Sequence, residues 1–199
     1  MAKTASQQGS GLTFERITED TFRDFARYHG TSPEIGRIGT YFEEAEDHGT
    51  EPHLFGLLGC GELCAVVCCT LGKHATDHSD ICKLDSVIVH DKLRKRGLAG
   101  ALVASAFLDL MNDGDLNITK IYSHAVHPAT VKLLSQLAFS TPPPVGAPIS
   151  SVRIDDATRD RFMTNCLVNS QNTITRLKLH CQFCLRNDRR ARPWCRRRS

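Results

Sequence analysis

The sequence predicts a single α/β domain in which helices flank a central sheet. Two observations carry this prediction: residues 84–110 and residues 120–139 each have the pattern of a strand followed by a helix. In the first segment Val87, Ile88 and Val89 form a β-branched run, which is typical of a strand covered on both faces. The chain of 199 residues is long enough to bury one sizeable core.

The first half of the chain is expected to add helices and a strand hairpin to this sheet. Thr18 can cap a helix whose first turn carries Glu19 and Asp20, which suit the positive end of the helix dipole. The expected elements are a strand over 12–17, a helix from Thr18 to Tyr28, a helix from Ser32-Pro33 to about Asp47, and strands over 54–58 and 63–70 joined at 59–61.

The second half is expected to alternate strands and helices and to end in a strand. Gly114 is the expected C-terminal cap of the apolar helix, and Leu177 to Leu185 alternates apolar and polar residues as a half-buried closing strand would. The other expected elements are a polar loop over 73–80, a strand over 82–89, a helix over 101–111, a strand from 120, a helix from Pro128, an irregular loop after Pro142-Pro143-Pro144 and a short strand over 152–154.

A basic glycine loop joins the strand to the apolar helix in the first segment. Its sequence is Arg94-Lys95-Arg96-Gly97-Leu98-Ala99-Gly100. Small residues let the backbone approach an anion, and the N-terminus of the following helix adds unpaired N–H groups and partial positive charge. The loop therefore predicts a phosphate or pyrophosphate site, although its spacing is that of neither a dinucleotide fold nor a P-loop. The alternative is an ordinary turn with solvated arginines.

The pattern Arg94-x-x-Gly97-x-Ala99 after Val-Ile-Val-His resembles the pyrophosphate loop of the GNAT (Gcn5-related) N-acetyltransferases. The ending Leu133-Leu134-Ser135-Gln136-Leu137-Ala138-Phe139 of the second segment is also similar to that family. The resemblance covers residues 12 to 139, and only weakly the rest. It implies a mixed, mostly antiparallel central sheet that is splayed at an acetyl-CoA site and flanked by helices.

The resemblance also implies which residues hold coenzyme A. The backbone of Val87, Ile88 and Val89 would bind the pantetheine arm and the thioester oxygen. The pyrophosphate would lie on the loop residues Arg94, Lys95, Arg96, Gly97, Leu98, Ala99 and Gly100. Two departures stand out: Leu134 occupies a position where many members have a tyrosine that protonates the thiolate, and His127 one where asparagine is common.

Transfer to an amine requires a base and, for the leaving thiolate, an acid. Asp85 is the first candidate base, because some members of the family have a glutamate or histidine at that offset. His124 and His127, at the end of the next strand, are alternatives, since imidazole titrates near neutral pH. Ser135, beside the missing tyrosine, is a weak candidate for the acid. A strand-end cap, a salt bridge or solvated histidines would equally explain these residues.

The acceptor, the cysteines and a metal site are less well determined. The acidic residues Glu43, Glu44, Glu46 and Asp47 could attract a cationic amine or form a solvated helix face. Six of the nine cysteines lie in apolar or alternating sequence, which indicates reduced thiols in a cytoplasmic protein. His180-Cys181-x-x-Cys184 with Cys195 loosely resembles a zinc knuckle, but strand alternation would place Cys181 and Cys184 on opposite faces, so no metal is expected.

Residues 186–199 form an arginine-rich tail. Seven arginines and one aspartate give it a formal charge of +6, so the rest of the chain is net negative. The tail is solvated, contacts RNA or another polyanion, or packs on the domain or on a partner protein. We expect a flexible leader over 1–11, one acyltransferase domain over 12–185 and this tail.

The sequence thus predicts an acetyl-CoA-dependent N-acetyltransferase that transfers directly to a primary amine in a ternary complex. The alternatives are a non-catalytic coenzyme A-binding module and an RNA-directed acetylase acting on aminoacyl-tRNA. The expected partners are a small-molecule or peptide amine, a polyanion at the tail and, as one option, a second copy of the chain. No membrane partner is expected, because no apolar run approaches the length of a span.

Overall fold

The computed structural model describes residues 12–29, 38, 40, 42, 50–59, 62–90, 93–124, 128–137, 139 and 150–187. Its strands are β1 (Leu12–Arg16), β2 (Glu51–Gly59), β3 (Glu62–Lys73), β4 (Asp80–Val89), β5 (Ile118–Ser123) and β6 (Ser150–Arg153). Its helices are α1 (Glu19–His29), α3 (Leu98–Asn112), α4 (Pro128–Gln136) and α5 (Asp156–Asn187). Among these described helices, none is both long enough and apolar enough to cross a membrane.

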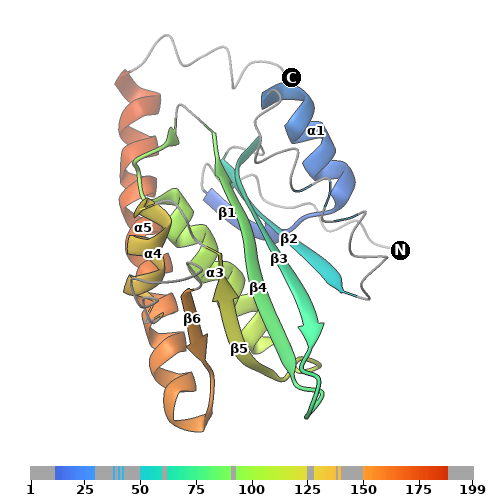
Figure 1. Ribbon diagram of the computed structural model, residues 1–199. Helices are drawn as coiled ribbons and strands as arrows, with labels where there is room; N and C mark the ends of the chain where they lie inside the picture. The colour runs from blue at the N-terminus through green and yellow to red at the C-terminus, as the bar shows by residue number, and fades with distance from the viewer. Residues whose placement is uncertain are drawn as a thin grey trace, which may run out of the picture.

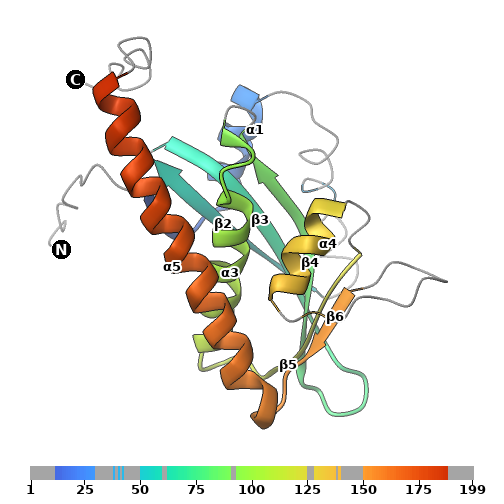
Figure 2. The same ribbon diagram turned by 90° about the vertical axis from the view of Figure 1, so that its left-hand side faces the viewer.

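The strands form one sheet in which spatial order follows chain order, from β1 to β6. Every neighbouring pair is antiparallel except β4 and β5, which are parallel. Helices α3 and α5 lie against one face of the sheet, and α1 lies on the other (Figures 1 and 2). The expectation of a mixed, mostly antiparallel sheet flanked by helices is confirmed.

Each face of the sheet has its own core, because side chains alternate along a strand. On one face, Val67 and Leu84 pack with Leu102 and Phe107 of α3 and with Phe162 of α5. On the other face, the second cluster joins α1 to the sheet and consists of Ile17, Phe22, Phe25, Ile38, Leu54, Val66, Cys68 and Ile88. Both faces of the central strands are therefore covered, as the β-branched run predicts.

The capping predictions have different outcomes at the two helices. The Thr18 Oγ1 accepts a hydrogen bond of 3.2 Å from the Thr21 amide, so the cap of α1 is confirmed. The prediction that Gly114 caps α3 is wrong. The helix gives way to Asp113 in an extended conformation, and the Asp113 carboxylate accepts a hydrogen bond of 3.3 Å from the Asp115 amide. A side chain thus closes this end, without a residue of positive φ.

The predicted closing strand over 177–185 is also wrong, because these residues belong to the long helix α5. Phe162, Cys166 and Ser170 are buried four residues apart along its first half, which is the spacing of one helix face. At its start, Asp155 and Thr158 bond reciprocally, each backbone amide donating to the other side chain at 2.9 Å. This capping box starts a helix, so the alternation of apolar residues over 177–185 does not mark a strand.

Helix α5 also removes the strand argument against zinc, since Cys181 and Cys184 lie on consecutive turns of a helix. Their side chains and Cys195 lie outside the described part. Within the described residues, no three His, Cys, Asp or Glu side chains are grouped to hold a metal ion. Four other predicted segments lie outside the described residues. They are most of the second expected helix with its acidic cluster, the leader, the loop after 142 and the tail from 188.

Three of the four cysteines described in the sheet are small core residues, as expected, whereas Cys64 is partly exposed. Cys68, Cys69 and Cys82 have no exposed surface. Burial raises the pKa of Cys68, and a hydrogen bond to Cys82 together with burial raises the pKa of Cys69. Burial also raises the pKa of Cys166 to about 12. The thiols of Cys68, Cys69 and Cys166 are therefore protonated at neutral pH, which argues against acyl-enzyme chemistry at these three residues.

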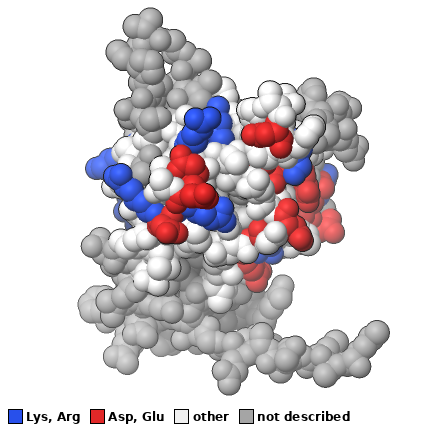
Figure 3. Space-filling view, turned by 90° about the horizontal axis from the view of Figure 1, so that it is seen from below, with Lys and Arg blue, Asp and Glu red and all other residues white. Residues whose placement is uncertain are grey.

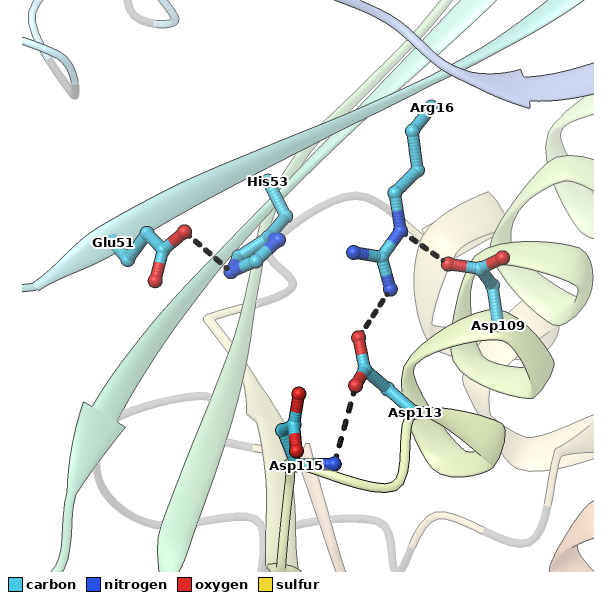
Figure 4. A network of polar contacts seen from close by, with 6 residues as sticks. All are labelled: Arg16, Glu51, His53, Asp109, Asp113 and Asp115. Atoms are coloured by element: carbon cyan, nitrogen blue, oxygen red, sulfur yellow. Dashed lines mark hydrogen bonds and ion pairs between the residues drawn. The ribbon is translucent and has the colours of Figure 1, made fainter.

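An ion-pair network ties the first strand to the C-terminal end of α3 (Figure 4). Arg16 Nε lies 2.6 Å from Asp109 Oδ2, and its Nη2 lies 2.7 Å from Asp113 Oδ2. The hydrogen bond from Arg16 holds the pKa of Asp113 below its usual value of 3.8. Nearby, burial lowers the pKa of His53, although Glu51 lies 3.6 Å from its Nε2. The network connects the edge of the sheet to the helix that follows the glycine loop.

This network should make stability depend on pH at the acid end. Because the pKa of Asp113 is lowered by folding, its contribution is present above pH 3.8 and is lost as pH falls through the folded pKa. Asp113→Asn should therefore lower the free energy of unfolding at neutral pH, and the difference from wild type should shrink below about pH 4. Urea unfolding over a pH series measures it.

The control is Asp115→Asn, which removes a neighbouring charge but keeps both ion pairs of Arg16. An Asp113→Asn difference that stays constant from neutral to acid pH would contradict the assigned role of the ion pair.

Candidate active site

The parallel strands β4 and β5 pair over a short length and then separate. Their last paired residues are Leu84 and Ser123, where β5 ends, whereas β4 continues to Val89. The buried Ser123 Oγ donates a hydrogen bond of 3.0 Å to the Leu84 carbonyl. At the other end of the pairing, the Asn117 amide donates to Asp80 Oδ2 at 2.8 Å. The two strands are thus joined firmly up to one point and form a fork beyond it.

Beyond the fork, β4 has β3 on one side and, among the described residues, no strand on the other. Val87, Ile88 and Val89 pair only with β3. Their second backbone edge therefore has hydrogen-bonding groups for an extended ligand. Figure 1 shows β4 continuing past the end of β5 towards the start of α3.

A β-bulge lies at the fork. Leu84 is opposite Cys69 and Ser86 is opposite Cys68, so Asp85 is the extra residue on β4. A bulge changes which face the following side chains occupy. Leu84 and Val87, three residues apart, accordingly both contact the core on the α3 face. Strand alternation already turns Asp85 away from the core that Leu84 contacts, and the bulge returns Val87 to that core.

The Asp85 carboxylate is held by partners from two strands. The Thr70 hydroxyl on β3 donates to its Oδ2 at 2.5 Å, and Lys83 Nζ lies 2.6 Å from its Oδ1. The Asp85 side chain has no exposed surface, whereas the Lys83 side chain is 32% exposed. The carboxylate is thus fixed at the base of the fork and covered from solvent, beside a lysine that is partly exposed.

The other candidate acid and base residues have different settings. His124 follows β5 directly and is exposed, with its ring edge-on to Tyr122 at a centroid distance of 5.8 Å. Asp85 and His124 are the residues that directly follow the last β4–β5 pair, so the fold brings these two candidates to one place. His127 lies outside the described residues. Ser135 is exposed on α4, where its hydroxyl donates to the Lys132 carbonyl at 2.8 Å.

The position of the missing tyrosine is filled by core packing, since Leu134 has no exposed surface and belongs to the cluster under α3. Its neighbour Leu133 approaches α3 closely. A Cβ added at Gly100 would lie 3.1 Å from Leu133 Cδ1, so a glycine at this position lets α4 pack beside the start of α3.

The glycine loop is shaped to expose backbone amides. Lys95 and Gly97 both have positive φ, 63° and 82°, and Gly97 caps α3 without a side-chain hydrogen bond. The first helical bond runs from the Ala101 amide to the Gly97 carbonyl, 3.1 Å, which leaves the amides of residues 98–100 ahead of it. The residues from Arg94 to Gly97 are exposed. Such a turn presents N–H groups and positive charge to an anion, so the loop fits a pyrophosphate.

The end of the molecule opposite the glycine loop has a different distribution of charge from the loop. Figure 3 shows this end, where acidic and basic side chains are interspersed. The loop, by contrast, places Arg94, Lys95 and Arg96 in succession.

The fold defined by this sheet and fork is a GNAT-type fold, because GNAT acetyltransferases of known structure share it. AtaTR bound with acetyl-CoA matches with a TM-score of 0.57 and 13% identity, over 79% of this chain and 98% of that chain. NAA60 of Arabidopsis thaliana, in complex with a bisubstrate analogue, matches with a TM-score of 0.52 and 13% identity, over 72% of this chain and 98% of that chain. AtaT complexed with acetyl-methionyl-tRNAfMet matches with a TM-score of 0.54 and 12% identity, over 77% of this chain and 98% of that chain.

No protein-family model and no curated protein sequence matches the chain. The structural similarity at 12–13% identity therefore establishes the fold. The roles of individual residues must be argued from the site itself.

The sequence analysis missed three residues of the fork: Thr70, Lys83 and Ser123. Lys83 and Asp85 are two residues apart, a spacing that places both on one face of a strand, and this was a usable signal. The bulge and the partner strand that supplies Thr70 have no local signature.

The buried hydroxyl of Ser123 should contribute to the stability of the fold. Ser123→Ala leaves the buried Leu84 carbonyl without this donor and should lower the free energy of unfolding by about 1–3 kcal/mol. The matched control is Ser135→Ala, which removes a similar bond to a carbonyl on an exposed helix surface and should change stability by less than about 0.5 kcal/mol. Urea unfolding of both variants tests this, and equal effects would show that the fork is not held by Ser123.

Proposed function

We propose that the chain is an acetyl-CoA-dependent N-acyltransferase that moves an acetyl group from coenzyme A to a primary amine by direct transfer in a ternary complex. The observation that carries this proposal is the course of β4. This strand runs from the fork to the glycine loop, whose backbone amides lie at the start of α3. An extended ligand with a pyrophosphate at one end and a thioester at the other matches that arrangement. The neighbouring AtaTR and NAA60 structures, described with acetyl-CoA or a bisubstrate analogue, support it.

The residues divide between the two ends of the ligand. The amides of Leu98, Ala99 and Gly100 would bind the pyrophosphate, helped by the charges of Arg94, Lys95 and Arg96 and by the open turn at Gly97. The edge of β4 that faces away from β3, at Val87, Ile88 and Val89, would bind the pantetheine arm. The thioester then lies at the fork, beside Asp85 and His124. Coenzyme A supplies the activated acyl group there.

Asp85 is our first candidate to receive the amine proton, because it is fixed at the fork by Thr70 and Lys83. His124, exposed beside the fork, is the second, and His127 remains a candidate from sequence. The hydroxyl of Ser135 donates to its own helix, so it supports a role as the acid less well. Fixed geometry supplies much of the rate in such a direct transfer, so a dedicated acid is not required.

The first test concerns the coenzyme A site. Gly97→Glu places bulk and negative charge where the pyrophosphate would bind, at a backbone φ of 82° that suits glycine. Affinity for coenzyme A in calorimetry should fall by about tenfold or more, since a charge-assisted contact is worth at least 1.4 kcal/mol. Arg94→Ala, which keeps the glycine, should weaken binding in the same direction.

The matched control is Gly114→Glu, because a side chain at Gly114 meets nothing within 4 Å and lies beyond the other end of α3. Coenzyme A affinity that is unchanged in both loop variants would overturn the assignment of the loop.

The second test concerns catalysis. Asp85→Asn should lower turnover of acetyl-CoA with amines by about 10²–10⁴-fold, the usual range for a general base, and should leave coenzyme A affinity unchanged. Asp80→Asn is the matched control, because Asp80 is also on β4 and pairs with a lysine, Lys73, at 2.6 Å. Thiol release across amine classes, with circular dichroism to confirm folding, measures the effect.

Native turnover in Asp85→Asn would contradict the role of Asp85 and transfer it to His124, His127 or water. The same assay separates the alternatives. A chain that binds coenzyme A but releases no thiol with any amine or aminoacyl-tRNA is a binding module, whereas release with aminoacyl-tRNA alone indicates the RNA-directed enzyme, for which the arginines of 186–199 would supply a polyanion contact.

A further inference from the structure

A primary amine of the chain itself lies at the base of the fork. Lys83 precedes the last pair of β4 and β5 by one residue, and its Nζ lies 2.6 Å from Oδ1 of Asp85, the first residue beyond that pair. The ammonium is therefore held where the proposed function places the acceptor amine. The Lys83 side chain is 32% exposed, so it is accessible from solvent, whereas Asp85 is covered.

We propose that Lys83 is a site of self-acylation: in the absence of a better acceptor, its Nζ takes the acyl group from acetyl-CoA bound to the same chain. This inference rests on the proposed function, because it uses the same cosubstrate and fork. It goes further by naming a modified residue and an acceptor that the chain carries.

The chemistry balances with groups at the fork. The Lys83 ammonium gives one proton to the Asp85 carboxylate, and the neutral amine attacks the thioester carbonyl carbon. The new C–N bond forms as the C–S bond breaks, and the departing thiolate takes the second proton from the nitrogen. The products are an N-acetyl-lysine and free coenzyme A, and Asp85 returns its proton to water.

The position of Lys83, and not ion pairing in general, makes it reactive. Lys73 forms an equally short pair, 2.6 Å, with Asp80, but at the opposite end of β4. The Lys73 side chain is also more exposed, 62%, so simple chemical acylation by acetyl-CoA in solution would favour it over Lys83. Site-directed transfer and random chemistry therefore predict opposite orders of modification for these two lysines.

Acylation of Lys83 would also change the site. It removes the cation beside Asp85 and leaves the buried carboxylate with the Thr70 hydroxyl as its remaining partner among those described above. A buried carboxylate without its counter-ion is costly, so the modified fork should hold Asp85 differently. Transfer to added amines should therefore change as Lys83 becomes modified.

The test is incubation of the full chain with acetyl-CoA and no added amine, followed by peptide mass spectrometry. We expect acetylation at Lys83 to exceed that at Lys73 by about tenfold or more, because positioning raises the effective concentration of the thioester. The rate constant should not depend on protein concentration, since the transfer is within one chain. Gly97→Glu should abolish modification of Lys83 and leave the low level at Lys73 unchanged.

Two further variants complete the experiment. Lys83→Arg keeps the positive charge, removes the nucleophile and should lose the modification, whereas Lys73→Arg should keep it. Equal or greater modification of Lys73, or a Lys83 signal that persists in Gly97→Glu, would overturn the inference. Acetylation of added amines without modification of Lys83 would overturn it and leave the proposed function standing, whereas failure to bind acetyl-CoA in calorimetry would overturn both.

Discussion

Parallel pairing of β4 with β5 is fixed at both ends, and the site depends on where it stops. Asp80 and Asn117 join the strands at one end, and the Ser123 hydroxyl bonds the Leu84 carbonyl at the other. Beyond that bond β4 continues with β3 as its one neighbouring strand among the described residues. The five residue pairs between β4 and β5 thus stabilise the centre of the sheet, and the last of them determines the position of the fork.

The bulge at Asp85 adds a second constraint to the same strand. One extra residue allows Leu84 and Val87 to share the core under α3 while Asp85 faces the opposite side. Without it, strand alternation would place residue 87 away from that core. One irregularity therefore keeps β4 packed on the hydrophobic core on both sides of Asp85.

Sequence reasoning identified the parts of the molecule whose signals are local. The glycine loop, the apolar helix and the cap at Thr18 are read from neighbouring residues, and the structure has them. Sequence reasoning was wrong where tertiary contacts determine the secondary structure. The second half of α5 alternates apolar and polar residues like a strand, but α5 is a helix because Phe162 and Cys166 pack against the core under α3. Thr70 could not be found as a partner of Asp85 either, since the pairing of β3 with β4 brings it there.

The order of strands in the sheet has a consequence for how the chain is made. Because every strand lies beside its predecessor in the chain, each can add to a growing sheet as it leaves the ribosome, and no strand has to wait for a later one. The contacts of Arg16 are the exception, since Asp109 and Asp113 are 93 and 97 residues away. Strand β1 therefore gains its ion pairs with the end of α3 only after more than half of the chain has been synthesised.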